Sequence, residues 1–298
     1  MEERHPSWAF NSSAAAHANA LAPELRKHGN RLSIPVKNEY RCVEYPTQRV
    51  EAVHVGRLGE TDAAQMTEPV CVISGVGPGT GSALARRFAA GGNCVAMLAR
   101  NAQRLAGLER ELPGSKGYSC DVSDPDQVEA TAERIERELG GPTTLVHNAV
   151  GGAFGSFLEI DPAVLNRNFQ VNTMGLLYLA RRLAPAMIRA GSGNIVVTGN
   201  TSALRGKPSF AGFAPTKAAQ RILTEAIARE LGPKGVHVAY IVIDAVIDVP
   251  WTRERFKAKP DEFFIKPAAI AEEAWHLTQQ DRSAWSFNVE LRPYGENW

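Results

Sequence analysis

The chain has 298 residues, of which 44% are hydrophobic and 22% are charged, the composition of an ordinary soluble globular protein. Its formal net charge of +1 gives no electrostatic reason to expect a nucleic acid or an anionic membrane as a partner. The sequence contains no run of about 18 apolar residues, so it predicts no membrane-spanning helix.

The N-terminal part differs in composition from the rest. It mixes alanine-rich, basic and acidic stretches without a steady periodicity, and its glutamates argue against a transit peptide. At Met66 the stretch MTEPVCVISG begins much as a complete domain would begin. We therefore predict a loosely structured extension over residues 1–65, or translation from an upstream start, followed by a single domain over residues 66–298. An arm that docks on the domain or on a partner is the alternative.

The cysteines indicate neither a metal site nor a disulfide framework. Cys42, Cys71, Cys94 and Cys120 show no C-x-x-C pair and no zinc-ligand spacing. The last three lie in apolar runs that predict strands, so we expect buried free thiols in a reducing compartment. Since no secretory h-region is present either, a cytoplasmic location is expected.

From Val70 onward, short apolar runs alternate with helical patterns. The predicted strands cover residues 70–74, 94–99, 116–122, 143–149, 193–199, 235–243 and 285–291. The predicted helices cover residues 81–92, 101–112, a stretch from Asp124, about 162–190, the segment that contains Lys217, and about 267–280. This alternation predicts an α/β fold with a doubly wound parallel sheet, helices on both faces, and ligands at the carboxyl ends of the strands.

A glycine-rich loop, SGVGPGTG, joins the first predicted strand to the first predicted helix. Its candidate cofactor-binding residues are Ser74, Gly75, Gly77, Gly79, Thr80 and Gly81. Glycine permits a tight turn and lets a pyrophosphate approach the backbone at the positive end of a helix. A purely structural turn is the alternative, but the position between a strand and a helix favours a dinucleotide cofactor.

The end of the second predicted strand bears on the choice of cofactor. Ala99 lies where a carboxylate would bind the ribose 2′-hydroxyl of NAD, and Arg100 follows it. An arginine there suits the additional phosphate of NADP, so NADP(H) is predicted in preference to NAD(H). Considered alone, Arg100 is equally explained as a solvated residue that opens a helix.

Five motifs follow one another along the chain. They are the loop 74–81, CDV at 120–122, HNAVG at 147–151, Asn172 in FQVNTMG, and Lys217 in FAPTK. In this order they resemble the short-chain dehydrogenase/reductase family over about residues 68–292. The resemblance implies a Rossmann-type fold and, as in many members, a homodimer or homotetramer. For the cofactor site, it implies that Asp121 and Val122 lie by the adenine and that Asn148 and Ala149 help to fix the sheet beside the cofactor. It also implies that Lys217 holds the nicotinamide ribose hydroxyls and that the backbone near Ile247 meets the carboxamide.

Catalysis in this family uses an asparagine, a serine, a tyrosine and a lysine together. Asn172 and Lys217 remain in this chain, whereas Phe213 occupies the tyrosine position and cannot donate a proton. Asn200 occupies the serine position, and Val249 replaces a threonine expected at the carboxamide. The sequence is similar to a divergent branch of the family in which phenylalanine replaces the tyrosine, the lysine is kept, and the reactions are mostly unassigned.

A substitute proton donor is needed if the site performs the family's chemistry. Asp244, at the end of a predicted strand, is our speculative candidate, since a partly desolvated carboxyl could keep a proton near neutral pH. A carboxylate that caps a turn is the alternative, and Asp248 has the same two interpretations. His147 titrates in a useful range but is expected to be structural. Phe213 and Phe210 either line an apolar substrate pocket or pack in the core.

Two functions remain open at this point. The first is an NADP-dependent oxidoreductase that transfers a hydride to or from a carbonyl, an alcohol or an activated alkene of a small-molecule substrate. In its atypical active site the substrate or another side chain supplies the proton. The second is a catalytically silent protein that binds NADPH as a sensor or as a structural ligand. A scaffold without any cofactor is disfavoured by the intact glycine loop and by Lys217.

Overall fold

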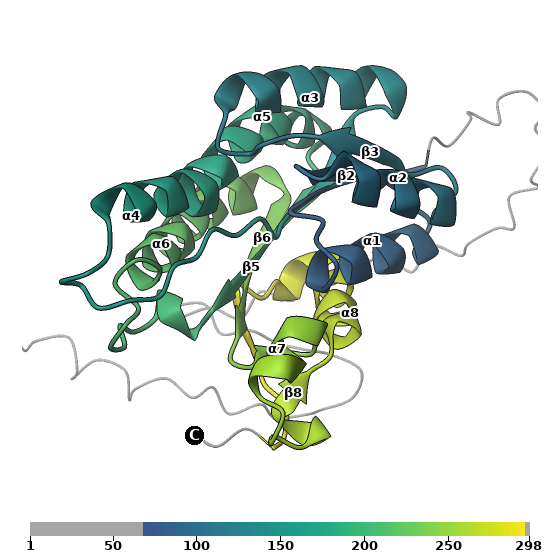
Figure 1. The fold of residues 1–298 in the computed structure, drawn as a ribbon. Coiled ribbons are helices and arrows are strands. Elements are labelled where there is room, and N and C mark those ends of the chain that lie inside the picture. The colour runs from purple at the N-terminus through teal and green to yellow at the C-terminus, as the bar shows by residue number, and fades with distance from the viewer. Residues whose placement is uncertain (1–67, 296–298) are drawn as a thin grey trace, which may run out of the picture. The chain divides into compact units, whose positions relative to one another are not determined.

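The computed structural model of this protein describes residues 68–295. The predicted extension, residues 1–65, and Cys42 lie outside this range. Seven strands form one parallel sheet in the order β3-β2-β1-β4-β5-β6-β9 (Figure 1). Their bounds are β1 Val70–Ser74, β2 Cys94–Ala99, β3 Lys116–Ser119, β4 Pro142–His147, β5 Gly193–Asn200, β6 Val236–Ile243 and β9 Asn288–Leu291. The predicted doubly wound α/β fold is confirmed.

Helices cover both faces of this sheet, and the two cores lie between them and the strands (Figure 1). The helices on one face are α3 (Pro125–Glu138), α5 (Gly175–Ala190) and α6 (Ala214–Leu231). Those on the other face are α1 (Thr80–Ala90), α2 (Ala102–Glu111) and α8 (Pro267–Thr278). The central strands are therefore buried on both faces, which is why their sequences are continuous apolar runs. Within residues 68–295 no helix is long and apolar enough to cross a membrane.

The helix boundaries follow local signals in the sequence. Asn101 and Asp124 precede α2 and α3, and their side-chain oxygens accept hydrogen bonds from backbone N–H groups of the first turns. Pro125 occupies the first turn of α3, where its missing N–H group is no loss. Gly191 ends α5 in the left-handed conformation, with φ 60°.

The long helix predicted over residues 162–190 is interrupted. It consists of α4 (Pro162–Phe169), a π-helical turn (Gln170–Met174) and α5. Inside the π-helical turn, the backbone carbonyl of Asn172 accepts a hydrogen bond of 2.7 Å from Gln220 Nε2 on α6. A widened turn lets a carbonyl reach a partner outside its own helix, and such turns are frequent at functional sites.

Three short elements after β6 were not predicted. They are β7 (Val246–Ile247), α7 (Pro250–Arg255) and β8 (Phe264–Ile265), and the two strands form a separate parallel pair. Strands of two residues are too short to show a periodic pattern. Three predicted strands were also too long, because β3 already ends at Ser119, β4 ends at His147, and β9 begins only at Asn288.

The cysteines inside the described range agree only in part with the expectation of buried thiols in strands, because Cys94 is partly exposed and Cys120 lies just after β3. Cys71, Cys94 and Cys120 are free thiols. Cys71 and Cys120 are buried, whereas Cys94 is partly exposed. Burial raises the pKa of the Cys71 thiol well above its ordinary value, which keeps it protonated and unreactive.

Candidate cofactor and active site

The strand order reverses between β1 and β4, so the loops that follow these strands diverge and open a crevice. A cavity of about 550 Å³ lies there. Its lining includes Gly75 from the glycine loop, Arg100 after β2, Asp121 and Val122 after β3, and Ala149 after β4. The fold therefore brings five of the predicted cofactor-binding residues to one cavity.

Packing explains three glycines of the loop but not the fourth. Gly75 has a φ of +77°, and a Cβ there would collide with the backbone of the segment after β4. A Cβ on Gly81 would collide with the carbonyl of Gly75, and a Cβ on Gly79 would lie 2.7 Å from Val249 Cγ1. At Gly77 a Cβ would meet nothing within 4 Å, so this position borders open space.

The same loop carries a buried hydroxyl group. Thr80 begins α1, and its Oγ1 is buried without a hydrogen-bond partner among residues 68–295. Burying a hydroxyl without a partner costs stability, and the first backbone N–H groups of a helix also lack partners inside the helix. In this loop the N–H groups of Ser82 and Ala83 donate to the carbonyls of Gly77 and Gly79. The Thr80 hydroxyl and the start of the helix fit a phosphate oxygen of a dinucleotide.

Asn148 connects the glycine loop to the middle of the sheet. Its Nδ2 donates to the carbonyl of Gly75 at 2.9 Å, and its Oδ1 accepts from Thr198 Oγ1 at 2.9 Å. This geometry agrees with the supporting role inferred from the resemblance. Ser74 differs from the expectation, because its side chain is fully buried with Oγ 2.9 Å from His147 Nδ1, and it supports the sheet from inside.

Asn172 is fully buried, and both ends of its side-chain amide are used within the protein. Its Oδ1 accepts from Gly151 N at 2.8 Å, and its Nδ2 donates to Gly151 O at 2.8 Å. The Nδ2 group also donates to Thr216 Oγ1 at 2.7 Å. Asn172 therefore fixes the loop after β4 against α6, which makes it a positioning residue.

Lys217 is buried on α6, with 3% of its surface exposed. Its Nζ donates to the carbonyl of Thr198 at 3.1 Å and to Gln220 Oε1. Burial lowers the pKa of this ammonium to about 7. Two of the three ammonium protons have partners, which leaves one for a ribose hydroxyl of a nicotinamide nucleotide.

Gln220 is a residue of the site that the sequence-based prediction missed. It is fully buried and lies one helical turn after Lys217. A signal was available, because Thr216, Lys217, Gln220 and Thr224 form a polar stripe on the buried face of α6. An amphipathic helix normally buries apolar residues there, so polar residues on this face require partners inside the protein.

Phe213, at the expected tyrosine position, packs in an aromatic cluster. Its ring lies 5.7 Å from that of Phe154, which in turn lies 5.0 Å from that of Phe210. Phe213 is buried, whereas Phe154 has 60% of its surface exposed. The two interpretations of these phenylalanines are therefore compatible, since one cluster is packed inside and reaches the surface as an apolar wall.

Asn200 lies at the end of β5 and caps the short 3-10 helix Thr201–Ala203. Its Oδ1 accepts a hydrogen bond from Ser202 N at 3.1 Å. An asparagine amide can donate a hydrogen bond to a substrate oxygen but cannot give up its proton. Asn200 can therefore orient a carbonyl without acting as an acid.

The three substitute donors considered from the sequence are poorly suited to deliver a proton. Asp244 Oδ2 lies 3.1 Å from Arg292 Nη2 and would have to leave that ion pair first. The Arg253 guanidinium binds both carboxylate oxygens of Asp248 and lowers the pKa of that carboxyl. Burial lowers the pKa of His147 to about 3, so its imidazole is neutral at physiological pH. The ion pair with Arg292 argues against Asp244 as the proton donor.

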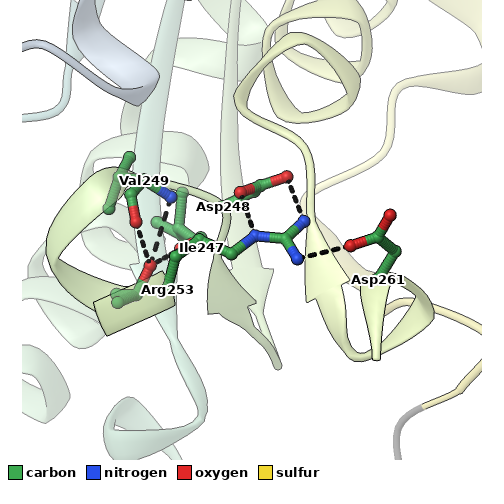
Figure 2. A network of polar contacts seen from close by, with 6 residues as sticks. Ile247, Asp248, Val249, Arg253 and Asp261 are labelled. Carbon is green, nitrogen blue, oxygen red and sulfur yellow. Dashed lines mark hydrogen bonds and ion pairs between the residues drawn. The ribbon is translucent and has the colours of Figure 1, made fainter. Parts of the chain in front are cut away.

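The segment after β7 is held in shape by its own polar contacts, as Figure 2 shows. In this network Arg253 bridges Asp248 and Asp261. Thr252 Oγ1 lies 2.5 Å from the carbonyl oxygen of Ile247 and accepts a hydrogen bond from Val249 N at 3.1 Å. The Ile247 carbonyl is thus engaged within the segment, and Val249 directs its methyl groups to the glycine loop.

Comparison with known proteins agrees with the fold. A family model described as short chain dehydrogenase matches residues 69–259. D-erythrulose reductase of Gallus gallus is 32% identical over 169 residues, which cover 56% of this chain and 67% of that protein. 3-Ketodihydrosphingosine reductase of Dictyostelium discoideum is 31% identical over 149 residues, or 49% of this chain, and the match spans 44% of that protein's length. A metagenomic short-chain oxidoreductase in complex with NADP is similar in structure over 76% of this chain and 98% of its own, with a TM-score of 0.67 and 27% identity.

Replacing Lys217 with methionine is expected to remove a pH-dependent part of the stability. An unfolded chain keeps its lysine proton up to the ordinary pKa of 10.5, whereas burial lowers the pKa of Lys217 to about 7. Between these values the unfolded state binds more protons, so the free energy of unfolding rises with pH. The urea midpoint of the native protein should therefore rise relative to that of Lys217→Met from about pH 7 to about pH 10. If the urea midpoints of the native protein and of Lys217→Met changed in parallel with pH, the lowered pKa of Lys217 would be contradicted.

Proposed function

The chain belongs to the short-chain dehydrogenase family of oxidoreductases, and we propose that it binds NADP(H) and transfers a hydride to or from a carbonyl, an alcohol or an activated alkene. The observation that carries this proposal is the buried Lys217 ammonium, which has one proton without an acceptor within residues 68–295, in a fold whose glycine loop fits a pyrophosphate. Burying a cation in this way is costly, which favours a role at a ligand over a purely structural one.

The residues that would hold the cofactor come from separate elements. Thr80 and the first turn of α1 bind the pyrophosphate, Asp121 and Val122 contact the adenosine, and Lys217 donates to the nicotinamide ribose. Arg100 lines the same cavity as Asp121, and Ala99 at the end of β2 replaces the carboxylate that would bind the ribose 2′-hydroxyl of NAD, which supports NADP(H) over NAD(H). When bound, the nicotinamide ring supplies or accepts the hydride.

The protein's own contribution is to bind and orient, because Phe213 has no proton to give. A positioned general acid contributes about 10²–10⁴ in rate, so hydride transfer persists in a weakened form without one. Asn200 donates a hydrogen bond to the substrate oxygen, and the phenylalanine cluster excludes water from one side of the site. The proton then comes from the substrate or from water, which suits an activated alkene protonated at carbon.

The second candidate function is a silent NADPH-binding protein. The observation in its favour is that Asp244, Asp248 and His147 are each engaged or neutral, while Phe213 lies in the place of the acid. A sensor or a structural ligand site needs the cofactor contacts but no proton donor. The two candidates share every contact to NADP(H) and differ only in turnover.

The remaining expectations rest on the resemblance and on the sequence. We propose a homodimer or homotetramer in the cytoplasm that acts on a small molecule and binds neither nucleic acid nor membranes. The N-terminal extension over residues 1–65 stays a prediction.

Replacing Arg100 with alanine is expected to weaken the binding of NADPH by about tenfold or more, since a charge-assisted hydrogen bond contributes about 1.5–3 kcal/mol. Binding of NADH should change little, because NADH has no 2′-phosphate. Titration of both nucleotides by fluorescence measures the two dissociation constants. Arg110→Ala, on the exposed last turn of α2, is the matched control. Equal losses for both nucleotides would remove the case for a phosphate contact at Arg100.

Turnover is tested by NADPH oxidation over a panel of ketones, aldehydes and enones. We expect slow turnover by the native protein and about 10²-fold faster carbonyl reduction by Phe213→Tyr, because the variant restores a general acid. Phe263→Tyr adds a hydroxyl outside the aromatic cluster of Phe213, where the ring packs against Phe264, and serves as the control. A silent native protein beside an active Phe213→Tyr would reject the enzyme in favour of the silent NADPH-binding protein.

A further inference from the structure

The side chain of Gln220 joins two parts of the site that are distant in sequence. Its Oε1 accepts a hydrogen bond from Lys217 Nζ, and its Nε2 donates to the carbonyl of Asn172 at 2.7 Å. The residue is fully buried, so water does not compete for either end of the amide. Gln220 thereby connects the Lys217 ammonium to the π-helical turn through two hydrogen bonds.

The number of protons on Lys217 decides what this arrangement can offer a ligand. An ammonium has three protons, and the carbonyl of Thr198 and Oε1 of Gln220 take two of them. A neutral amine has two protons, and the carbonyl of Thr198 and Oε1 of Gln220 would still accept hydrogen bonds from both. Lys217 therefore donates to a ribose hydroxyl when it is charged, and presents a lone pair when it is neutral.

The groups that face Lys217 are neutral. From α6 it meets the Gln220 amide, from β5 the Thr198 carbonyl, and the carbonyl of Asn172 follows in the π-helical turn. From β4, His147 interacts electrostatically with Lys217, but its imidazole stays uncharged because burial lowers its pKa to about 3. A carboxylate in place of Gln220 would hold the ammonium in its charged form, whereas a neutral amide orients it and lets it lose its proton.

We propose that Gln220 is a positioning residue that orients the Lys217 donor toward the nicotinamide ribose and sets the pH above which the affinity for NADP(H) falls. The proposal rests on the proposed binding of NADP(H). This role differs from a purely structural one, because the pH at which Lys217 loses its proton depends on whether residue 220 is neutral or charged, and not only on its size.

The first test does not need the cofactor. Lys217 is followed by NMR in protein labelled with ε-¹³C lysine, its signal being identified by its loss in Lys217→Met. We expect the titration midpoint of Lys217 to rise by about one pH unit or more in Gln220→Glu, because a nearby carboxylate favours the ammonium. In Gln220→Leu the midpoint should fall, because the ammonium loses a hydrogen-bond acceptor. Gln103→Glu, on the exposed side of α2, is the control and should leave the signal unmoved. An unchanged titration in both Gln220 variants would overturn the proposal.

The second test follows the dissociation constant of NADPH from about pH 6 to about pH 10. For the native protein we expect affinity to fall several-fold as Lys217 loses its proton, and for Gln220→Glu the fall should move to higher pH. Variants that merely lower the unfolding temperature, with the pH profile of binding unmoved, would show a structural role and contradict the proposal. Absence of NADPH binding at any pH would reject the proposed function, whereas the NMR titration reports on Gln220 and Lys217 alone.

Discussion

The Lys217 ammonium is buried with neutral hydrogen-bond partners, and the other parts of the site are arranged around this cation. One partner is the carbonyl of Thr198 on β5, and the other is Gln220 on α6, which itself binds the carbonyl of Asn172. The cation thus links β5, α6 and the π-helical turn. Removing an ammonium from water is costly unless its protons find acceptors, so these three elements have to meet at fixed positions.

Holding a cofactor and delivering a proton are separate tasks, and in the proposed function this chain performs the first without a side chain that performs the second. The glycine loop, Thr80 and Lys217 supply the donors that a dinucleotide needs. At the place of the acid, Phe213 packs against Phe154, and the carboxylate of Asp244, after β6, is paired with Arg292. Side chains in this state can bind, orient and exclude water. The chemistry they favour is therefore one in which the substrate or the solvent provides the proton.

Local features of the fold were predictable from the sequence, whereas contacts between distant segments were not. The strands Val70–Ser74 and Cys94–Ala99 have the predicted bounds, and Asp124 caps α3, because apolar runs and capping residues act over a few neighbouring positions. The π-helical turn is joined to α6 by a hydrogen bond between Asn172 and Gln220, 48 positions apart, and the ion pair of Asp244 needs Arg292 near the C-terminal end of the domain. No periodicity reports such pairs. The lysine could thus be identified as a candidate from its motif. The polar stripe of α6 indicates that Gln220 needs partners inside the protein, but not that these are Lys217 and the carbonyl of Asn172.

The measurement that tests this account most directly is isothermal titration calorimetry of NADPH into the native protein and into Lys217→Met at neutral pH. The account predicts saturable binding of one nucleotide per chain by the native protein. It predicts a loss of about tenfold or more in Lys217→Met, because the variant lacks the charged donor at the ribose. No saturable binding by the native protein, or equal affinities for the two proteins, would contradict the claim that Lys217 is kept as a clamp for the cofactor.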